Sequence, residues 1–221
     1  MQTVTVPLTI TLNVAVRVDG AASIGAEAEQ STAAPLVDEV TMENAGSFLP
    51  SLADMPEGFR QRGEGEGSTN EKLAESWPDP DAALQRLTEL GRIGSYYRTF
   101  QAPGLPLVGN ATIDATLVLF DSPEGAANAV ALYRERAQAG VDSGEYDSIS
   151  PVAVTGLGEN ADAYVLYKAP SEQGAADGYD ETDIYAVKGN VMVSVLSRSF
   201  PGVGDAKQLI DLAKLVYGRL P

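Results

Sequence analysis

Four carboxylates lie close together in the C-terminal third of the chain. Asp177, Asp180, Glu181 and Asp183 fall within seven residues, and closely spaced carboxylate oxygens are ligands that Ca²⁺ prefers. Their spacing does not follow the D-x-D-x-D-G pattern of a calcium-binding loop, and no Glu stands at the twelfth position. We interpret the segment as a solvated hairpin loop, and leave cation binding by Asp177, Asp180 and Asp183 as the alternative.

A glycine-rich segment has the letters of a dinucleotide-binding fingerprint. Residues 156–161 read GLGENA, which fits G-x-G-x-x-A. That fingerprint needs a helix after the glycines, because helical N–H groups bind the pyrophosphate. The following residues, ADAYVLYK, alternate as a strand does. The segment is therefore predicted to be a turn or bulge, and no cofactor is expected.

Cysteine and histidine are absent from the whole chain. This excludes disulfides, zinc sites built from Cys and His, and the Ser-His-Asp and Cys-His catalytic arrangements. A hydrolase that uses two carboxylates stays open as an alternative, because folding can bring any such pair together. The sequence indicates no particular pair, so we expect a protein that is not an enzyme.

Composition sets further bounds on partners. The formal net charge is −16, and 44% of the residues are hydrophobic, as in an ordinary globular protein. The negative charge argues against nucleic acid as a partner. No apolar run approaches the roughly 20 residues of a membrane-spanning helix. The N-terminus has no signal-peptide pattern, so an exported protein would already have lost its signal.

Aromatic residues gather around the first predicted helix. Most of them are expected to pack in the core. Trp77, Tyr96 and Tyr97 form a candidate cleft for a small-molecule ligand, because aromatic side chains commonly line such clefts.

The clearest periodic pattern lies at the N-terminus. Residues 3–19 read TVTVPLTITLNVAVRVD, and apolar residues occupy the even positions from 4 to 18. This alternation predicts a strand with one apolar face, of about 50 Å when extended. Common strands have about 3–10 residues, so we expect this one to pair with a partner sheet. Its pairing residues would be Val4, Val6, Leu8, Ile10, Leu12, Val14, Val16 and Val18.

Three regions follow from these patterns. Residues 1–19 form the N-terminal strand, and residues 20–47 form an acidic connector rich in Ala, Glu and Ser. Residues 48–221 form the main domain. Whether the strand pairs within its own chain or with a neighbouring copy is not decided by the sequence.

The main domain is predicted to be α+β, a mostly antiparallel sheet packed by three helices. Pro80 after Asp79, Ser122 before Pro123, and Asp205 are typical helix starts, and they predict helices over residues 79–90, 122–139 and 205–220. Strands are expected over residues 55–59, 96–101, 111–120, 152–155, 161–168, 183–188 and 191–199. Residues 60–77 are expected to be mainly a polar loop.

Five segments carry a resemblance to known proteins. They read LPSLADMPEGF, TNEKLAESW, DPDAALQRLTELGRIGSYYRTF, VTGLGENA and YAVKGNVMVSVLSRS. From residue 49 to 220 the chain resembles secreted proteins of thermophilic Chloroflexi and some actinobacteria. It is loosely similar to extracellular sensor domains of mycobacterial serine/threonine kinases. The resemblance implies an α+β fold located outside the cytoplasm, and it transfers no functional residue.

Two functions from different classes are therefore expected. The first is an extracellular or cell-surface assembly protein, in which residues 3–19 add to the sheet of a neighbouring copy and build an oligomer or filament. The second is an extracytoplasmic ligand-binding or sensor-like module, in which the strand pairs within its own sheet.

Overall fold

The computed structural model describes residues 39–104, 109–170 and 178–221. Residues 1–38 lie outside this part, so the predicted N-terminal strand and most of the predicted connector are not described. At the end of that connector, Val40 and Ala45 are buried in the same core as the main domain.

The domain is built on one seven-stranded sheet with the order β1-β2-β3-β7-β6-β5-β4, and all neighbouring strands are antiparallel. This confirms the predicted α+β class. The strands are β1 (Arg60–Glu66), β2 (Arg92–Gln101), β3 (Thr112–Phe120), β4 (Ser148–Pro151), β5 (Ala161–Lys168), β6 (Tyr179–Lys188) and β7 (Val191–Ser199).

Four α-helices begin at residues that cap them. Besides the short α1 (Asn70–Ala74), they are α2 (Pro80–Glu89), α3 (Pro123–Asp142) and α4 (Ala206–Arg219). The side chains of Asp79, Ser122 and Asp205 each accept a hydrogen bond from a backbone N–H in the first turn, which satisfies a donor that the helix leaves unpaired. Gly91, with φ of +66°, ends α2 in the left-handed conformation that glycine tolerates.

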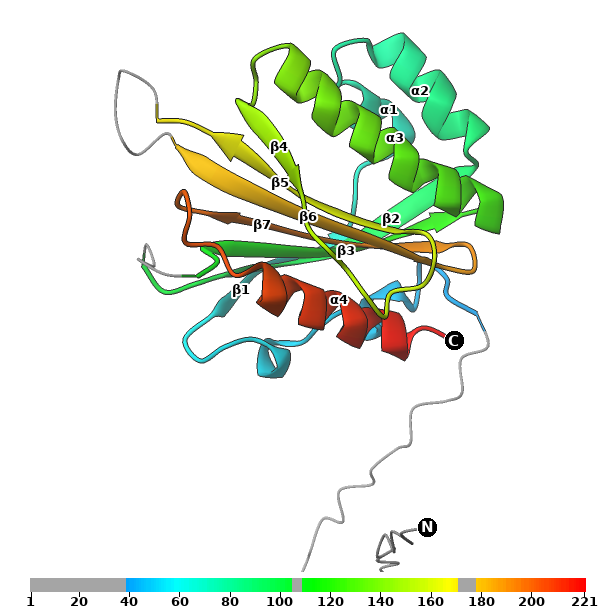
Figure 1. The fold of residues 1–221 in the computed structure, drawn as a ribbon. Coiled ribbons are helices and arrows are strands. Elements are labelled where there is room, and N and C mark those ends of the chain that lie inside the picture. Colours follow the sequence, from blue (N-terminus) through cyan, green and yellow to red (C-terminus); the bar gives the residue numbers. More distant parts are fainter. Residues whose placement is uncertain (1–38, 105–108, 171–177) are drawn as a thin grey trace, which may run out of the picture. The chain divides into compact units, whose positions relative to one another are not determined.

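The helices cover both faces of the sheet (Figure 1). The α4 face packs an apolar cluster that includes Ile113, Leu117, Val193 and Val195 from the central strands. On the other face, α3 packs against a second cluster around Phe120, Tyr164 and Met192, and α1 and α2 lie against α3. Among the described helices, none is long and apolar enough to cross a membrane.

Several element boundaries differ from the sequence predictions. Residues 60–66, predicted as loop, form the edge strand β1, whose side chains are mostly exposed and show no apolar alternation. Residues 55–59 and 152–155 are not strands, and β4 lies just before the second of these segments. Strand β6 begins at Tyr179, four residues earlier than predicted. The earlier start matters because it places Glu181 inside the sheet.

Candidate functional site

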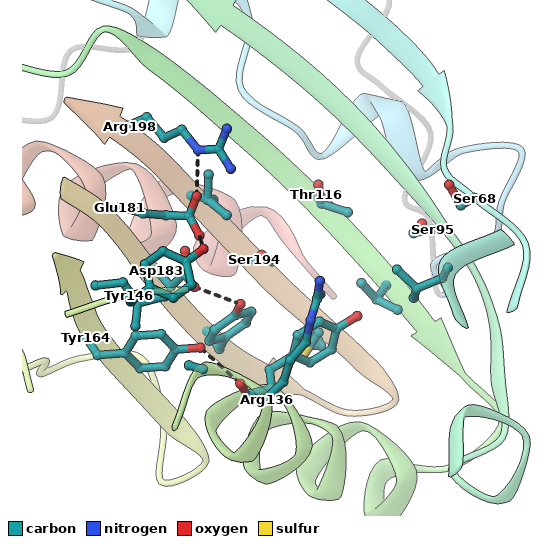
Figure 2. A pocket seen from close by; sticks show the side chains of 18 of the residues that line it. Ser68, Ser95, Thr116, Arg136, Tyr146, Tyr164, Glu181, Asp183, Ser194 and Arg198 are labelled. Atoms are coloured by element: carbon teal, nitrogen blue, oxygen red, sulfur yellow. Dashed lines mark hydrogen bonds and ion pairs between the residues drawn. The ribbon is translucent and has the colours of Figure 1, made fainter. Parts of the chain in front are cut away.

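A polar cavity of about 390 Å³ lies between α3 and the sheet. Its lining residues come from β2, β3, β5, β6, β7, from α1 and α3, and from the segments that flank these helices. Figure 2 shows Thr116 and Ser194 on neighbouring strands, with Arg136 opposite them on α3. Thr116 and Ser194 are direct cross-strand partners, so two hydroxyls occur where an apolar core would have aliphatic side chains.

The alternation of β7 explains this polar surface. Val191, Val193 and Val195 face the cluster beneath α4. The intervening residues Ser194 and Arg198 line the cavity on the opposite face, because successive side chains of a strand point to opposite sides. The sequence VMVSVLSRS therefore builds an apolar core on one face and part of a polar cavity on the other.

Asp183 is the most unusual residue of the cavity. Asp183 is 5% exposed, and its Oδ2 accepts a hydrogen bond of 3.3 Å from the hydroxyl of Tyr185. Oδ1 is buried and has no hydrogen-bond partner among the described residues. Burial, followed by the negative charge of Glu181, raises the pKa of Asp183 to about 7. A buried carboxylate oxygen without a partner is costly, and a ligand that donates a hydrogen bond to it would remove this cost.

Glu181 lies two residues earlier on the same face of β6 and is fully engaged. Oε1 accepts a hydrogen bond of 3.0 Å from the hydroxyl of Tyr146, and Oε2 accepts one of 2.6 Å from Nε of Arg198. The Glu181 side chain is 7% exposed. Its charge is therefore balanced inside the protein, in contrast to that of Asp183.

Tyrosine rings surround Asp183. Tyr164 is its cross-strand partner on β5, and the rings of Tyr133 and Tyr185 stack at a centroid distance of 5.3 Å. Burial, followed by the negative charge of Asp183, raises the pKa values of the Tyr164 and Tyr185 hydroxyls. Both phenols are consequently neutral at physiological pH and can donate or accept hydrogen bonds.

Arg92 marks the other end of the cavity. The residue is 6% exposed, and its guanidinium donates hydrogen bonds to Oδ1 of Asn70 (2.7 Å), the carbonyl of Ser68 (3.1 Å) and Oγ of Ser95 (2.8 Å). All of these acceptors are neutral. Its Nε has no partner in the described part of the chain. A buried guanidinium without a carboxylate is suited to bind an anionic group.

Arg136 supplies a second guanidinium at this cavity. Figure 2 shows it extending from α3 into the space between the helix and the sheet. Its Cζ lies 4.9 Å from the centroid of the Trp77 ring, and no ion pair joins it to a described carboxylate. Its positive charge lowers the pKa of Asp183, although burial and Glu181 raise that pKa more.

The three aromatic residues predicted to line a ligand cleft do not share one. Tyr96 packs against the cluster on the α4 face, and its hydroxyl lies 3.4 Å from Oε1 of Glu64. Tyr97 points to the α3 face, because adjacent residues of a strand alternate, but it is not among the cavity residues. Trp77 lies before α2, with its ring edge-on to Tyr133 at 6.3 Å, and lines a neighbouring hollow of about 540 Å³ between α2 and α3.

The predicted acidic cation site is also not assembled. Asp177 lies outside the described residues. Asp180 and Asp183 point to opposite faces of β6, and Oδ2 of Asp180 accepts a hydrogen bond from the N–H of Gly202. Within the ranges that the structure describes, no group of three or more acidic residues could hold a metal ion. The GLGENA segment is a turn that precedes β5, as predicted, with Gly156 and Gly158 at positive φ.

Of the cavity residues, the sequence singles out Glu181 and Asp183, but only as part of an acidic loop. Glu181, Asp183 and Tyr185 follow each other at every second position, which is the spacing of one strand face. Thr182, Ile184 and Ala186 occupy the other face and are also buried. The sequence signal for this part of the cavity is therefore a strand with two different faces. One face carries acidic and aromatic residues, and the other carries small or apolar residues. The closely spaced carboxylates of residues 177–183 obscure this signal, because they favour a loop.

The fold is similar to that of a solved extracellular domain. The chain matches the crystal structure of the extracellular domain of PknH from Mycobacterium tuberculosis with a TM-score of 0.50 and 12% sequence identity, over 81% of this chain and 96% of that one. At this identity the match concerns the fold alone. No protein-family model and no curated protein matches the chain.

Proposed function

We propose that residues 39–221 form an extracytoplasmic ligand-binding module and that the cavity between α3 and the sheet is its binding site. The observation that carries the proposal is Asp183, which lines this cavity and whose buried Oδ1 has no partner among the described residues. A volume of about 390 Å³ lies within the range of small-molecule sites.

The polar lining indicates the kind of ligand. The cavity is lined by the hydroxyls of Ser95, Thr116 and Ser194, by tyrosine phenols and by charged groups. A hydrophobic ligand would leave Oδ1 of Asp183 and Nε of Arg92 without hydrogen bonds, which costs free energy. The ligand is therefore a small polar molecule.

Binding is favoured over catalysis by the state of the two carboxylates. A hydrolase of the two-carboxylate type needs both groups to reach the substrate. Both oxygens of Glu181 are occupied, one by Tyr146 and one by Arg198. Glu145, the remaining acidic residue of the lining, is exposed, so among the described residues Asp183 is the only buried carboxylate of the cavity with an oxygen that has no partner. This arrangement suits recognition of a ligand better than acid–base chemistry.

The location proposed for this module rests on the comparison with known structures. The protein with the similar fold is described as an extracellular domain. This description supports a sensor-like role over the assembly role considered from the sequence.

The test is to fill the cavity. In Ser194→Trp, an indole would occupy the space beside Thr116, whereas Gln85→Trp places the same side chain on the exposed surface of α2. A library of small polar compounds is screened by thermal shift and by ligand-observed NMR. Compounds that bind the wild type and Gln85→Trp should lose binding to Ser194→Trp. Binding that is equally strong in Ser194→Trp would contradict the proposal.

A further inference from the structure

Two buried ionisable groups, the carboxyl of Asp183 and the guanidinium of Arg92, line the same cavity, and neither has an ionic partner in the described part of the protein. Asp183 accepts one hydrogen bond, from a phenol. Arg92 donates only to an amide, a carbonyl and a hydroxyl. Removing one charge from water is costly unless a partner balances it. The cavity contains two such charges, which points to a ligand that supplies both partners.

The two charges are well separated across the sheet. Asp183 lies on β6, and Ser95, which accepts a hydrogen bond from Arg92, lies on β2. Strands β7 and β3 lie between them, so their backbones are about 14 Å apart across the strands. Asp183 pairs with Leu196 of β7. Ser95 pairs with Val118 of β3, which in turn pairs with Met192 of β7. The spacing of Met192 and Leu196 along β7 therefore places Asp183 and Ser95 about 13 Å apart along the strands. Figure 2 accordingly shows Asp183 and Ser95 at different ends of the cavity, with Arg136 between them.

We propose that the cavity binds an elongated zwitterion, with its ammonium group at Asp183 and its anionic group at Arg92 and Arg136. This inference rests on the proposed function, since it specifies the ligand of the same site. In small metabolites that also carry an amine, the anionic group that best matches a planar guanidinium is a carboxylate, because the two groups can form two parallel hydrogen bonds.

The environment of Asp183 fits an ammonium group. An ammonium carries three donors and no acceptor, and Oδ1 offers an unused acceptor. The rings of Tyr133, Tyr164 and Tyr185 lie close to one another, and aromatic faces attract cations. Glu181 does not compete for the ligand, because Arg198 already balances its charge.

The middle of the cavity fits a polar chain. Ser194 and Thr116 are paired across β7 and β3, and Figure 2 shows them between Asp183 and Ser95, the hydrogen-bond partner of Arg92. Their hydroxyls can donate to or accept from a peptide-like amide. A simple amine would leave Arg92 unpaired, a simple carboxylate would leave Asp183 unpaired, and an uncharged polyol would leave both unpaired.

Calorimetry with matched probes tests the charge requirement. The probes are 6-aminohexanoate and triglycine as zwitterions, hexylamine and hexanoate as the single charges, and sorbitol as the uncharged compound. Both zwitterions should bind about tenfold or more tightly than the other three, because only they pair both charges. Equal affinity of hexylamine and 6-aminohexanoate would overturn the inference.

Charge-removing variants locate the two ends. Asp183→Asn should weaken zwitterion binding about tenfold or more and leave hexanoate binding little changed. Arg136→Met, which disturbs no hydrogen bond of the described fold, should weaken the binding of hexanoate and of the zwitterions but not the binding of hexylamine.

Arg92→Met tests the buried end of the cavity, with the melting temperature of the variant measured in parallel. Asp81→Asn and Arg62→Met, on exposed positions, are the matched controls and should bind as the wild type does.

The variant Ser194→Trp separates this inference from the proposed function. If sorbitol binds the wild type as tightly as the zwitterions and loses binding in Ser194→Trp, the cavity is a ligand site and the zwitterion inference is wrong. If every probe that binds the wild type binds Ser194→Trp equally well, both the inference and the proposed function are wrong.

Discussion

The hydroxyl of Tyr185 donates a hydrogen bond of 3.3 Å to Oδ2 of Asp183, two residues earlier on the same face of β6. This contact satisfies one carboxylate oxygen and leaves Oδ1 as a buried acceptor in the cavity. The phenol provides no positive charge, so Asp183 stays easy to protonate. Its protonation should therefore be visible both in the stability of the protein and in ligand binding.

The first prediction concerns the pH dependence of stability. The pKa of Asp183 is about 7 in the folded protein, above the ordinary value of 3.8. The folded state therefore holds this proton more tightly than the unfolded state, and the contribution of Asp183 to stability is lost as pH rises from about 4 through 7. Its size is on the order of 4 kcal/mol, at about 1.4 kcal/mol for each unit of the pKa shift.

Urea unfolding of the wild type and Asp183→Asn at pH 4.5 and pH 8 measures this contribution. The variant cannot ionise, so its stability relative to the wild type should rise by a few kcal/mol between the two pH values. The subtraction removes the contributions of the other carboxylates. A stability difference that is the same at both pH values would show that Asp183 is not held as a weak acid.

The second prediction concerns the pair of Glu181 and Arg198. Arg198→Met should destabilise the protein by about 2–4 kcal/mol, because it leaves the buried Glu181 carboxylate without its cation. Adding Glu181→Gln in the same chain should restore most of the loss. The control is Lys72→Met, which breaks an exposed pair with Glu75 and should cost less than about 1 kcal/mol. Denaturant unfolding compares the variants, and equal losses at the two pairs would contradict the account.

The third prediction concerns residues 1–38. The strands, helices and core described here lie within residues 39–221, so a chain that starts at residue 39 should fold and keep the cavity. If residues 3–19 pair with neighbouring copies, the full chain should be oligomeric and the shortened chain monomeric by light scattering.

Point variants of the predicted strand test the same pairing. Leu8→Asp, on its apolar face, should also give a monomer, whereas Thr9→Asp, on the other face, should not. Identical assembly of the full and shortened chains would exclude strand exchange.

Local signals accounted for much of the fold. The bounds of β7 match the predicted residues 191–199, because its alternation and the preceding Gly-Asn turn are strong signals within one short segment. The start of α2 was predicted equally well from Asp79 and Pro80. Strand β1 was missed because its sequence, RQRGEGE, is that of an exposed edge strand, where charged residues discourage unwanted pairing.

The cavity could not be predicted in the same way. It combines Arg92 of β2, Arg136 of α3 and Asp183 of β6, which are far apart in the sequence and meet only through the strand order. Whether a carboxylate is buried without a partner is also a property of packing and not of spacing. The sequence contained a partial signal in the alternation of Glu181, Asp183 and Tyr185, but nothing that indicated a cationic partner was missing.

The measurement that tests the central claim most directly is an NMR titration of the Asp183 carboxyl carbon in the free protein and with saturating 6-aminohexanoate. The account predicts titration with a pKa near 7 in the free protein and a pKa lower by about one unit or more with the ligand, because an ammonium at Oδ1 stabilises the charged form. A pKa of Asp183 that is unchanged at saturation would contradict the claim that this residue binds the cationic end of a ligand.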